Sequence, residues 1–124
     1  MTKEQATSLI ETYKKAWITQ DPELILSMFT PDATFNDPSE SAAVGHEGIR
    51  QYWTSKVVEG QKDISFTLKN VWVDGNTVVA EWDASFVDTV RNLKISLSSV
   101  GIFTVAGDKF CASREYYKST KTAL

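Results

Sequence analysis

The two halves of the chain have different hydrophobic periodicities. In the first half, hydrophobic residues recur every three or four positions, which predicts helices with one buried face. The first such stripe consists of Leu9, Ile10, Tyr13, Ala16 and Trp17. Thr2 and Gln5, just before it, have the spacing of a capping box. The sequence therefore predicts that an amphipathic helix opens the fold.

Two further helices are predicted before the middle of the chain. Asp21 followed by Pro22 is a favourable helix start, because the Asp side chain caps the helix and proline fits its first turn. The inner face of this second helix carries Leu24, Ile25, Met28 and Phe29. A third helix is predicted from Gly45 to Gly60, with an inner face of Ile49, Tyr52, Trp53 and Val57.

The second half of the chain alternates hydrophobic and polar residues, which is the pattern of strands with one buried face. A short strand is also predicted at residues 33–37, ending at Pro38 and followed by a loop at residues 39–44. The four long strands are predicted at Asp63–Asp74, Thr77–Asp88, Leu93–Val105 and Lys109–Lys118. Gly75 and Gly107 lie in hairpin turns between them, so consecutive strands are expected to pair antiparallel.

A sheet of this kind cannot bury its hydrophobic face alone, so the three N-terminal helices must cover it. Long, twisted strands are expected to curl around those helices. The predicted fold is a single α+β domain over residues 1–124, a cone-shaped curved antiparallel sheet that encloses an apolar pocket.

Composition and charge narrow the classes of function. Hydrophobic residues make up 42% of the chain and the net charge is −3, without a cluster of Lys or Arg. We therefore expect a globular protein without a nucleic-acid partner. There is no hydrophobic stretch of membrane-spanning or signal-peptide length, so we expect no membrane association and a cytoplasmic location. Cys111 is the sole cysteine, which excludes an intrachain disulfide.

Three segments give the sequence a family resemblance. Residues 29–38 (FTPDATFNDP), residues 45–53 (GHEGIRQYW) and residues 114–117 (REYY) resemble segments of the NTF2-like superfamily. Within that superfamily the chain is similar to SnoaL-like polyketide cyclases and ketosteroid isomerases. The resemblance implies the cone-shaped fold, also called a cystatin-like roll. It also implies a pocket for a small molecule and catalysis without a cofactor or metal.

The resemblance to ketosteroid isomerases also suggests catalytic residues. Their general base falls on Asp37, and the tyrosine that binds the substrate carbonyl falls on Tyr13. The protonated aspartate that assists this tyrosine falls near Ser99, which is a weaker donor. Asp37 is expected among Trp17, Trp53, Phe66 and Phe103, where loss of solvation would raise its pKa. The alternative for Asp37 is a turn residue that faces solvent. The alternative for Tyr13 is a core residue whose hydroxyl forms a hydrogen bond with the backbone.

Glu115 is the third candidate catalytic residue. By strand alternation it faces the pocket, where it is either a second acid–base group or a protonated donor. The alternative is a surface carboxylate displaced by a bulge or paired with arginine. The expected substrate-binding residues are Trp17, Phe35, Trp53, Phe66, Trp82, Phe86, Ser99, Phe103 and Tyr117. The sequence alone does not separate pocket wall from core among them.

These residues suggest an enzyme that transfers protons on a small, largely apolar carbonyl compound, as an isomerase or cyclase does. A binding module without catalysis and an assembly module remain alternatives. Epoxide hydrolysis by the Asp-Arg-Asp set of related enzymes is not expected, because two of those positions fall on or near Trp82 and Ala84. A homodimer is expected through the second face of the sheet. That face is predicted to carry Val71, Val73, Val79, Val87, Val100 and Ile102.

Overall fold

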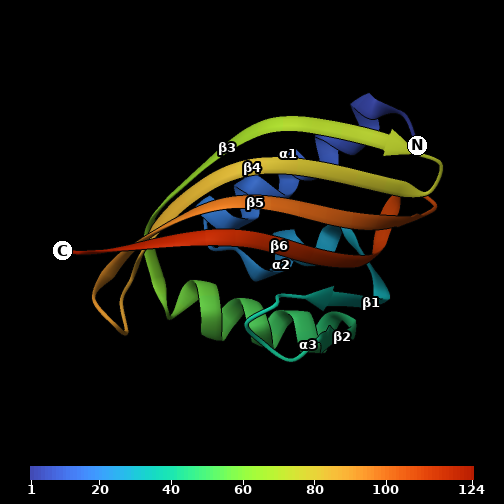
Figure 1. The fold of residues 1–124 in the computed structure, drawn as a ribbon. Helices are drawn as coiled ribbons and strands as arrows, with labels where there is room; N and C mark the ends of the chain where they lie inside the picture. Colours follow the sequence, from blue (N-terminus) through green and yellow to red (C-terminus); the bar gives the residue numbers. More distant parts are fainter.

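The computed structural model describes residues 1–124 and has an α+β fold in which one curved sheet wraps around helices (Figure 1). The elements in chain order are α1 (Lys3–Ile18), α2 (Pro22–Ser27), β1 (Phe29–Asn36), β2 (Ala43–Val44), α3 (Gly45–Tyr52), the π-helix η1 (Trp53–Val58), β3 (Gln61–Asp74), β4 (Thr77–Asp88), β5 (Leu93–Ala106) and β6 (Lys109–Ala123). The predicted order of two helices, a short strand, a third helix and four long strands is confirmed, whereas β2 lies in the segment predicted as a loop. No helix is long and apolar enough to span a lipid bilayer.

The first two helices begin where their capping residues predict. In α1, the Gln5 N–H donates to the Thr2 hydroxyl at 3.1 Å, and the Thr2 N–H donates to the Gln5 side-chain oxygen at 2.8 Å. In α2, the Asp21 carboxylate accepts from the N–H groups of Glu23 and Leu24. These bonds satisfy N–H groups that have no partner inside the helix, so the helix boundaries follow directly from local sequence.

The sheet has the strand order β2-β1-β6-β5-β4-β3. Pairing is antiparallel throughout β3–β6, as predicted, but β1 lies parallel to β6. The sheet is therefore mixed and not wholly antiparallel. The reason is that β1 and β6 are not joined by a hairpin: the chain runs from β1 through β2, α3, η1 and β3–β5 before it reaches β6, a connection long enough for parallel pairing.

The core lies between the concave face of the sheet and α1. The predicted stripe is confirmed except at one position. The buried side chains of α1 include Ala6, which was not predicted, and leave out Leu9, which is only partly buried; the full set is Ala6, Ile10, Tyr13, Ala16 and Trp17. They meet aromatic rings from the strands, including Phe66 and Trp82, whose rings stack at 5.4 Å. Gly101 is required here, because a Cβ at this position would lie 2.6 Å from the Trp82 ring. The absence of a side chain lets the indole lie against β5.

A bulge in β3 changes which residues face outward. Leu68 pairs with Trp82 and Asn70 pairs with Glu81, which leaves one extra residue in β3. An extra residue exchanges the two faces of the strand beyond it. Val71 therefore lies in the core and Val73 packs against it, contrary to the prediction that both face outward. In their place Trp72 points outward and is 52% exposed.

Candidate active site in the cone

A cavity of about 500 Å³ opens between the concave face of the sheet, α1 and the α3–η1 helix. Ten of its 21 lining residues are hydrophobic, so the cavity is amphipathic and not the mainly apolar pocket that the sequence predicts. The apolar wall includes Trp17, Trp53, Phe86, Ile95 and Leu97. The cavity also carries three carboxylic acids and three tyrosines. The carboxylic acids are Asp37, Asp88 and Glu115, and the tyrosines are Tyr13, Tyr52 and Tyr117.

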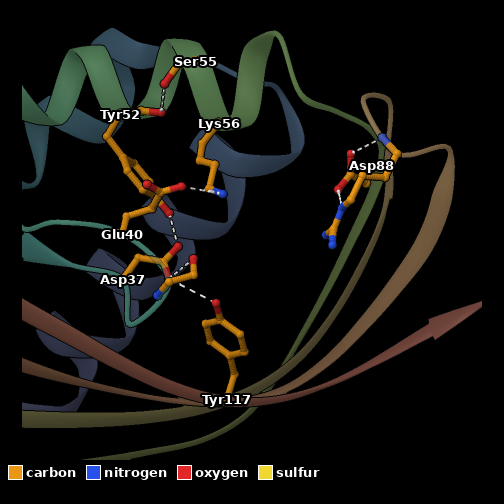
Figure 2. Close-up of polar contacts among 9 residues, drawn as sticks. Asp37, Glu40, Tyr52, Ser55, Lys56, Asp88 and Tyr117 are labelled. Carbon is orange, nitrogen blue, oxygen red and sulfur yellow. Dashed lines mark hydrogen bonds and ion pairs between the residues drawn. The ribbon is translucent and has the colours of Figure 1, made fainter.

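Asp37 is held by hydrogen bonds from three other residues (Figure 2). Tyr52 donates its hydroxyl to Oδ2 at 2.5 Å, and Tyr117 donates its hydroxyl to Oδ1 at 3.1 Å. Ser39 adds its backbone N–H at 2.9 Å and its hydroxyl at 2.8 Å, both to Oδ1. Oδ1 therefore accepts three hydrogen bonds, whereas Oδ2 accepts one and keeps capacity for another partner.

These donors reverse the pKa shift expected for Asp37. Burial raises the pKa of this carboxyl, since only 9% of the residue is exposed. The hydrogen bonds from Tyr52, Ser39 and Tyr117 stabilise the charged form and outweigh burial, so the pKa lies below its ordinary value of 3.8. Asp37 is ionised at neutral pH. The sequence-based prediction of a raised pKa is wrong because it did not include these three donors.

The second carboxyl, Glu115, is joined to Tyr13. The Tyr13 hydroxyl donates to Glu115 Oε1, although the two residues belong to α1 and β6. Burial raises the pKa of Glu115 from 4.5 to about 7, the charge of Asp37 adds to the rise, and the Tyr13 hydrogen bond opposes it. Glu115 therefore changes its protonation state near neutral pH. Oε2 receives no hydrogen bond from the protein.

Tyr13 is fixed by the rings around it. It is 3% exposed, and its ring lies 5.6–6.3 Å from the rings of Trp17, Trp53, Phe66, Trp82 and Phe103. Burial raises the pKa of Tyr13, so its phenol keeps its proton over the physiological range. A rigid aromatic surround of this kind points the hydroxyl in one direction, toward Glu115 and the cavity.

The expected substrate-binding residues divide into two groups. The cavity is lined by Trp17, Trp53, Phe86 and Tyr117. Five others lie in the core and do not line it: Phe35, Phe66, Trp82, Ser99 and Phe103. Ser99 lies on β5 opposite Tyr117, and the Tyr13 hydroxyl donates to Glu115 and not to Ser99. The resemblance to ketosteroid isomerases implies a second donor that assists Tyr13, at a position near Ser99. In the structure the residue bonded to Tyr13 is Glu115.

Several polar residues of the cavity were not among the predicted site residues. Tyr52 was expected only as part of a buried helix face, and that pattern alone does not reveal that its hydroxyl reaches Asp37. Ser39 lies in a segment predicted only as a loop, although Asp-Pro-Ser has the composition of a turn in which Asp accepts from the residue two positions on. Lys56, Arg91 and Lys121 also line the cavity, and no local pattern marks them.

Two of the three positions that align with the Asp-Arg-Asp set of epoxide hydrolases carry neither a carboxyl nor a guanidinium here. Trp82 is 1% exposed and Ala84 is 5% exposed, and both belong to the core cluster. Water activation by that set of residues therefore has no counterpart in this chain.

Solved structures with similar folds include several NTF2-like proteins. An NTF2-like protein from Anabaena variabilis is 26% identical, with a TM-score of 0.83, and the match covers 98% of this chain and 92% of that one. A candidate SnoaL-like polyketide cyclase from Shewanella denitrificans is 15% identical, with a TM-score of 0.77 and coverage of 90% and 89%. An LEH-like epoxide hydrolase from M. tuberculosis is 16% identical, with a TM-score of 0.76 and coverage of 94% and 84%.

Sequence comparison supports the same grouping. No curated protein matches the chain significantly. The family model of the SnoaL-like domain, however, matches residues 10–113, which include the second half of α1 and most of the strands. This match covers most of the chain, and the fold agrees with it. The protein therefore has the NTF2-like fold and belongs to the SnoaL-like domain family.

Proposed function

We propose that the protein is an enzyme that transfers a proton on a small, largely apolar carbonyl compound, as an isomerase or cyclase. The observation that carries the proposal is the pair of carboxyls on one cavity whose pKa values move in opposite directions. That of Asp37 is lowered, and that of Glu115 is raised to about 7. Carboxyls separated in this way take the roles of base and acid in one site.

In the proposed reaction Asp37 is the base. Its Oδ2 takes a proton from the carbon next to the substrate carbonyl, and the electrons of that C–H bond move to form an enolate. Tyr52 and Tyr117 hold the carboxylate in place, which fixes its direction at some cost in basicity. Return of the same proton to a different carbon completes an isomerisation. In a cyclisation the enolate carbon instead attacks a second carbonyl of the substrate, and the proton passes from Asp37 to the alkoxide that this forms.

Glu115 and Tyr13 supply the acid side of the reaction. In its protonated form Glu115 donates to the substrate carbonyl oxygen, where negative charge develops in the enolate. Tyr13 donates to the other Glu115 oxygen and so keeps the carboxyl pointed into the cavity. Catalysis by a positioned acid or base contributes roughly 10²–10⁴-fold to a rate, so two such groups suffice for a moderately activated proton.

A binding module without catalysis is the second candidate, and one observation favours it. The four hydrogen bonds on Asp37 and its lowered pKa are also what a purely structural carboxylate has. In that case the Asp37 cluster would fix the segment between β1 and β2 beside α3, and the cavity would hold a ligand that leaves unchanged.

Cyclohex-3-en-1-one is a suitable first probe, because it is a small β,γ-unsaturated ketone that becomes conjugated after one proton transfer. We expect the protein to accelerate the appearance of the conjugated enone, measured by ultraviolet absorbance, and exchange of the α-protons in D₂O, measured by NMR. Asp37→Asn should lose both activities, and Glu115→Gln should slow both by at least tenfold. Asp83→Asn on the outer face of the sheet is the matched control. Activity equal to wild type in Asp37→Asn would exclude the proposed base.

A further inference from the structure

The turn between β4 and β5 forms one end of the cavity and is anchored on two sides. The Thr89 N–H donates to the Gly60 carbonyl at 3.0 Å, and the Thr89 hydroxyl donates to the Glu59 carbonyl at 3.2 Å. At the other side, the Asn92 N–H donates to the Asp88 carbonyl at 2.8 Å. The turn is thereby tied both to the end of the helix and to its own strand, which gives its side chains a defined direction.

Within this turn Asp88 orients Arg91. Asp88 Oδ1 accepts from the backbone N–H groups of Val90 and Arg91, both at 3.0 Å, and Oδ2 accepts from Arg91 Nε at 2.7 Å. The Asp88 side chain is 15% exposed, whereas that of Arg91 is 53% exposed. The backbone N–H and guanidinium of Arg91 hold the pKa of Asp88 below its ordinary value, so this carboxylate stays charged.

The remaining edge of the Arg91 guanidinium is free. Nη1 and Nη2 have no hydrogen-bond partner in the protein, although Arg91 lines the cavity. Because Nε is already bound to Asp88, the guanidinium is held at that edge. The two terminal nitrogens then present a fork that matches the two oxygens of a carboxylate. A pre-oriented arginine loses less side-chain freedom on binding than a mobile lysine does.

A second cation lies on the same end of the cavity. Lys121 also lines the cavity, pairs with Ile95 in the sheet register and forms no ion pair. It lies six residues beyond Glu115 on β6, or roughly 20 Å along an extended strand. Figure 2 shows Asp88 at the end of β4, apart from Asp37 and Tyr117. Lys56 differs, because it is already paired with Glu40 at 2.7 Å.

We propose that Arg91, with help from Lys121, binds a carboxylate at the outer end of the ligand. The cavity would then select an elongated, amphipathic organic acid: the carboxylate binds at the turn, the apolar middle contacts Phe86 and Leu97, and the carbonyl reaches Asp37 and Glu115. The position of the reacting carbonyl rests on the proposed function, whereas the carboxylate site itself does not. Arg91 is a specificity residue in this scheme, and Asp88 is its positioning residue.

Two fluorescent probes of nearly equal shape test the carboxylate site without any turnover. 1-Anilinonaphthalene-8-sulfonate carries an anionic group with the same fork-like oxygens, and N-phenyl-1-naphthylamine is the same ring system without it. We expect wild type to bind the anionic probe at least tenfold more tightly than the neutral one. Octanoate should displace the anionic probe, and octanamide should not. Octyl phosphate is the third competitor, and displacement by it in place of octanoate would overturn the assignment to a carboxylate.

Variants separate the turn from the rest of the surface. Arg91→Gln should weaken binding of the anionic probe at least tenfold and change the affinity for the neutral probe less than twofold. The affinity of Arg91→Lys for the anionic probe should lie between those of wild type and Arg91→Gln. Asp88→Asn should weaken the anionic probe, because Arg91 is no longer oriented. Arg50→Gln is the matched control: Arg50 is ion-paired with Glu23 and Glu47 and does not line the cavity.

Three further outcomes would overturn the proposal: equal affinity of wild type for the two probes, equal loss of affinity for both probes in Arg91→Gln, or the same loss of affinity in Arg50→Gln. Asp37→Asn distinguishes this site from the proposed chemistry. If the proposed function alone is wrong, Asp37→Asn and wild type are equally inactive and both retain the preference for the anionic probe.

Discussion

Tyr13 and Glu115 lie 102 residues apart in the sequence and share a hydrogen bond in the cone. The bond joins the first helix to the last strand across the core. It brings together a phenol that keeps its proton and a carboxyl whose pKa lies near 7. Because Glu115 is buried more favourably in its neutral form, this contact also makes the stability of the fold depend on pH.

Glu115→Gln is expected to stabilise the protein at alkaline pH. In the unfolded chain Glu115 ionises near its ordinary pKa of 4.5, whereas in the fold it does so at about 7. Its contribution to the free energy of unfolding is therefore full below pH 4.5 and is lost as the pH rises through 7. That loss is at most ~3 kcal/mol, and glutamine, which cannot ionise, should avoid it.

Urea denaturation of wild type and Glu115→Gln at pH 4.5 and pH 8 measures this difference. The free energy of unfolding of Glu115→Gln minus that of wild type should be larger at pH 8 than at pH 4.5. Glu11→Gln, an exposed position on α1, is the control and should show no such gain. A pH-independent difference between Glu115→Gln and wild type would contradict the raised pKa.

The rate of proton transfer is expected to fall as the pH rises through about 7. Glu115 must be protonated to donate to the substrate oxygen, and the fraction in that form decreases above its pKa. Asp37 is already ionised well below this range, so it adds no rising limb near neutrality. A profile of kcat/KM against pH would measure this, and Glu115→Gln should be slower and flat. A rate that rises through pH 7 would instead assign the base to Glu115.

Asp37→Asn is expected to destabilise the fold at neutral pH by about 1–3 kcal/mol. The lowered pKa means that the carboxylate contributes stability above pH 3.8, which is lost as the pH falls through the folded-state pKa. An asparagine amide also cannot accept all of the bonds that reach Oδ1 and Oδ2. The difference from wild type should be larger at pH 7 than at pH 3. Asp83→Asn, at an exposed position, should change little. A more stable Asp37→Asn protein would mean that burial, and not the hydrogen bonds, dominates.

The elements follow from local sequence, whereas the site depends on contacts that local sequence does not contain. Helix starts at Thr2 and Asp21 are determined by side chains within three residues of each N–H that they cap. The alternation of inward and outward side chains in β4 and β5 follows directly from the sequence, because the pairing of these two strands contains no bulge. These features need no knowledge of the rest of the chain.

Two features could not be predicted in this way. The bulge in β3 turns Val71 inward and Trp72 outward, because an extra residue exchanges the faces of the strand, and no glycine or proline marks it. The pKa of Asp37 depends on hydroxyls from Tyr52 and Tyr117, which belong to a helix and to a strand 80 residues away. Both outcomes depend on how the elements are placed relative to one another.

Trp53→Ala is expected to cost about 3–5 kcal/mol of stability. Trp53 is 1% exposed, and its ring lies 5.9 Å from Tyr13 and 6.4 Å from Phe35. Removing it leaves a void between η1 and the core and loosens the support of Tyr13. Trp53→Phe keeps a ring and should lose less. Thermal unfolding of both variants measures the effect, and a melting temperature equal to wild type for Trp53→Ala would show that the ring is not needed for packing.

We predict a homodimer formed through the outer face of the sheet. The outward-facing apolar residues are Trp72, Val79, Val100, Ile102 and Tyr116, of which Trp72 and Tyr116 are 52% and 55% exposed. The register makes them neighbours, since Val79 pairs with both Trp72 and Ile102, and Val100 pairs with Tyr116. A contiguous apolar patch of this kind is self-complementary in a two-fold dimer, where it meets its own copy.

Trp72→Lys should therefore convert the dimer to a monomer, because each interface would gain two lysines within an apolar contact. Light scattering at micromolar concentration measures the mass of wild type and variant. Val44→Lys is the control, because Val44 is 65% exposed on β2, at the opposite edge of the sheet from β3. The control should remain dimeric. A monomeric wild type would contradict the predicted dimer. A dimer that persists in Trp72→Lys would show that the interface lies elsewhere.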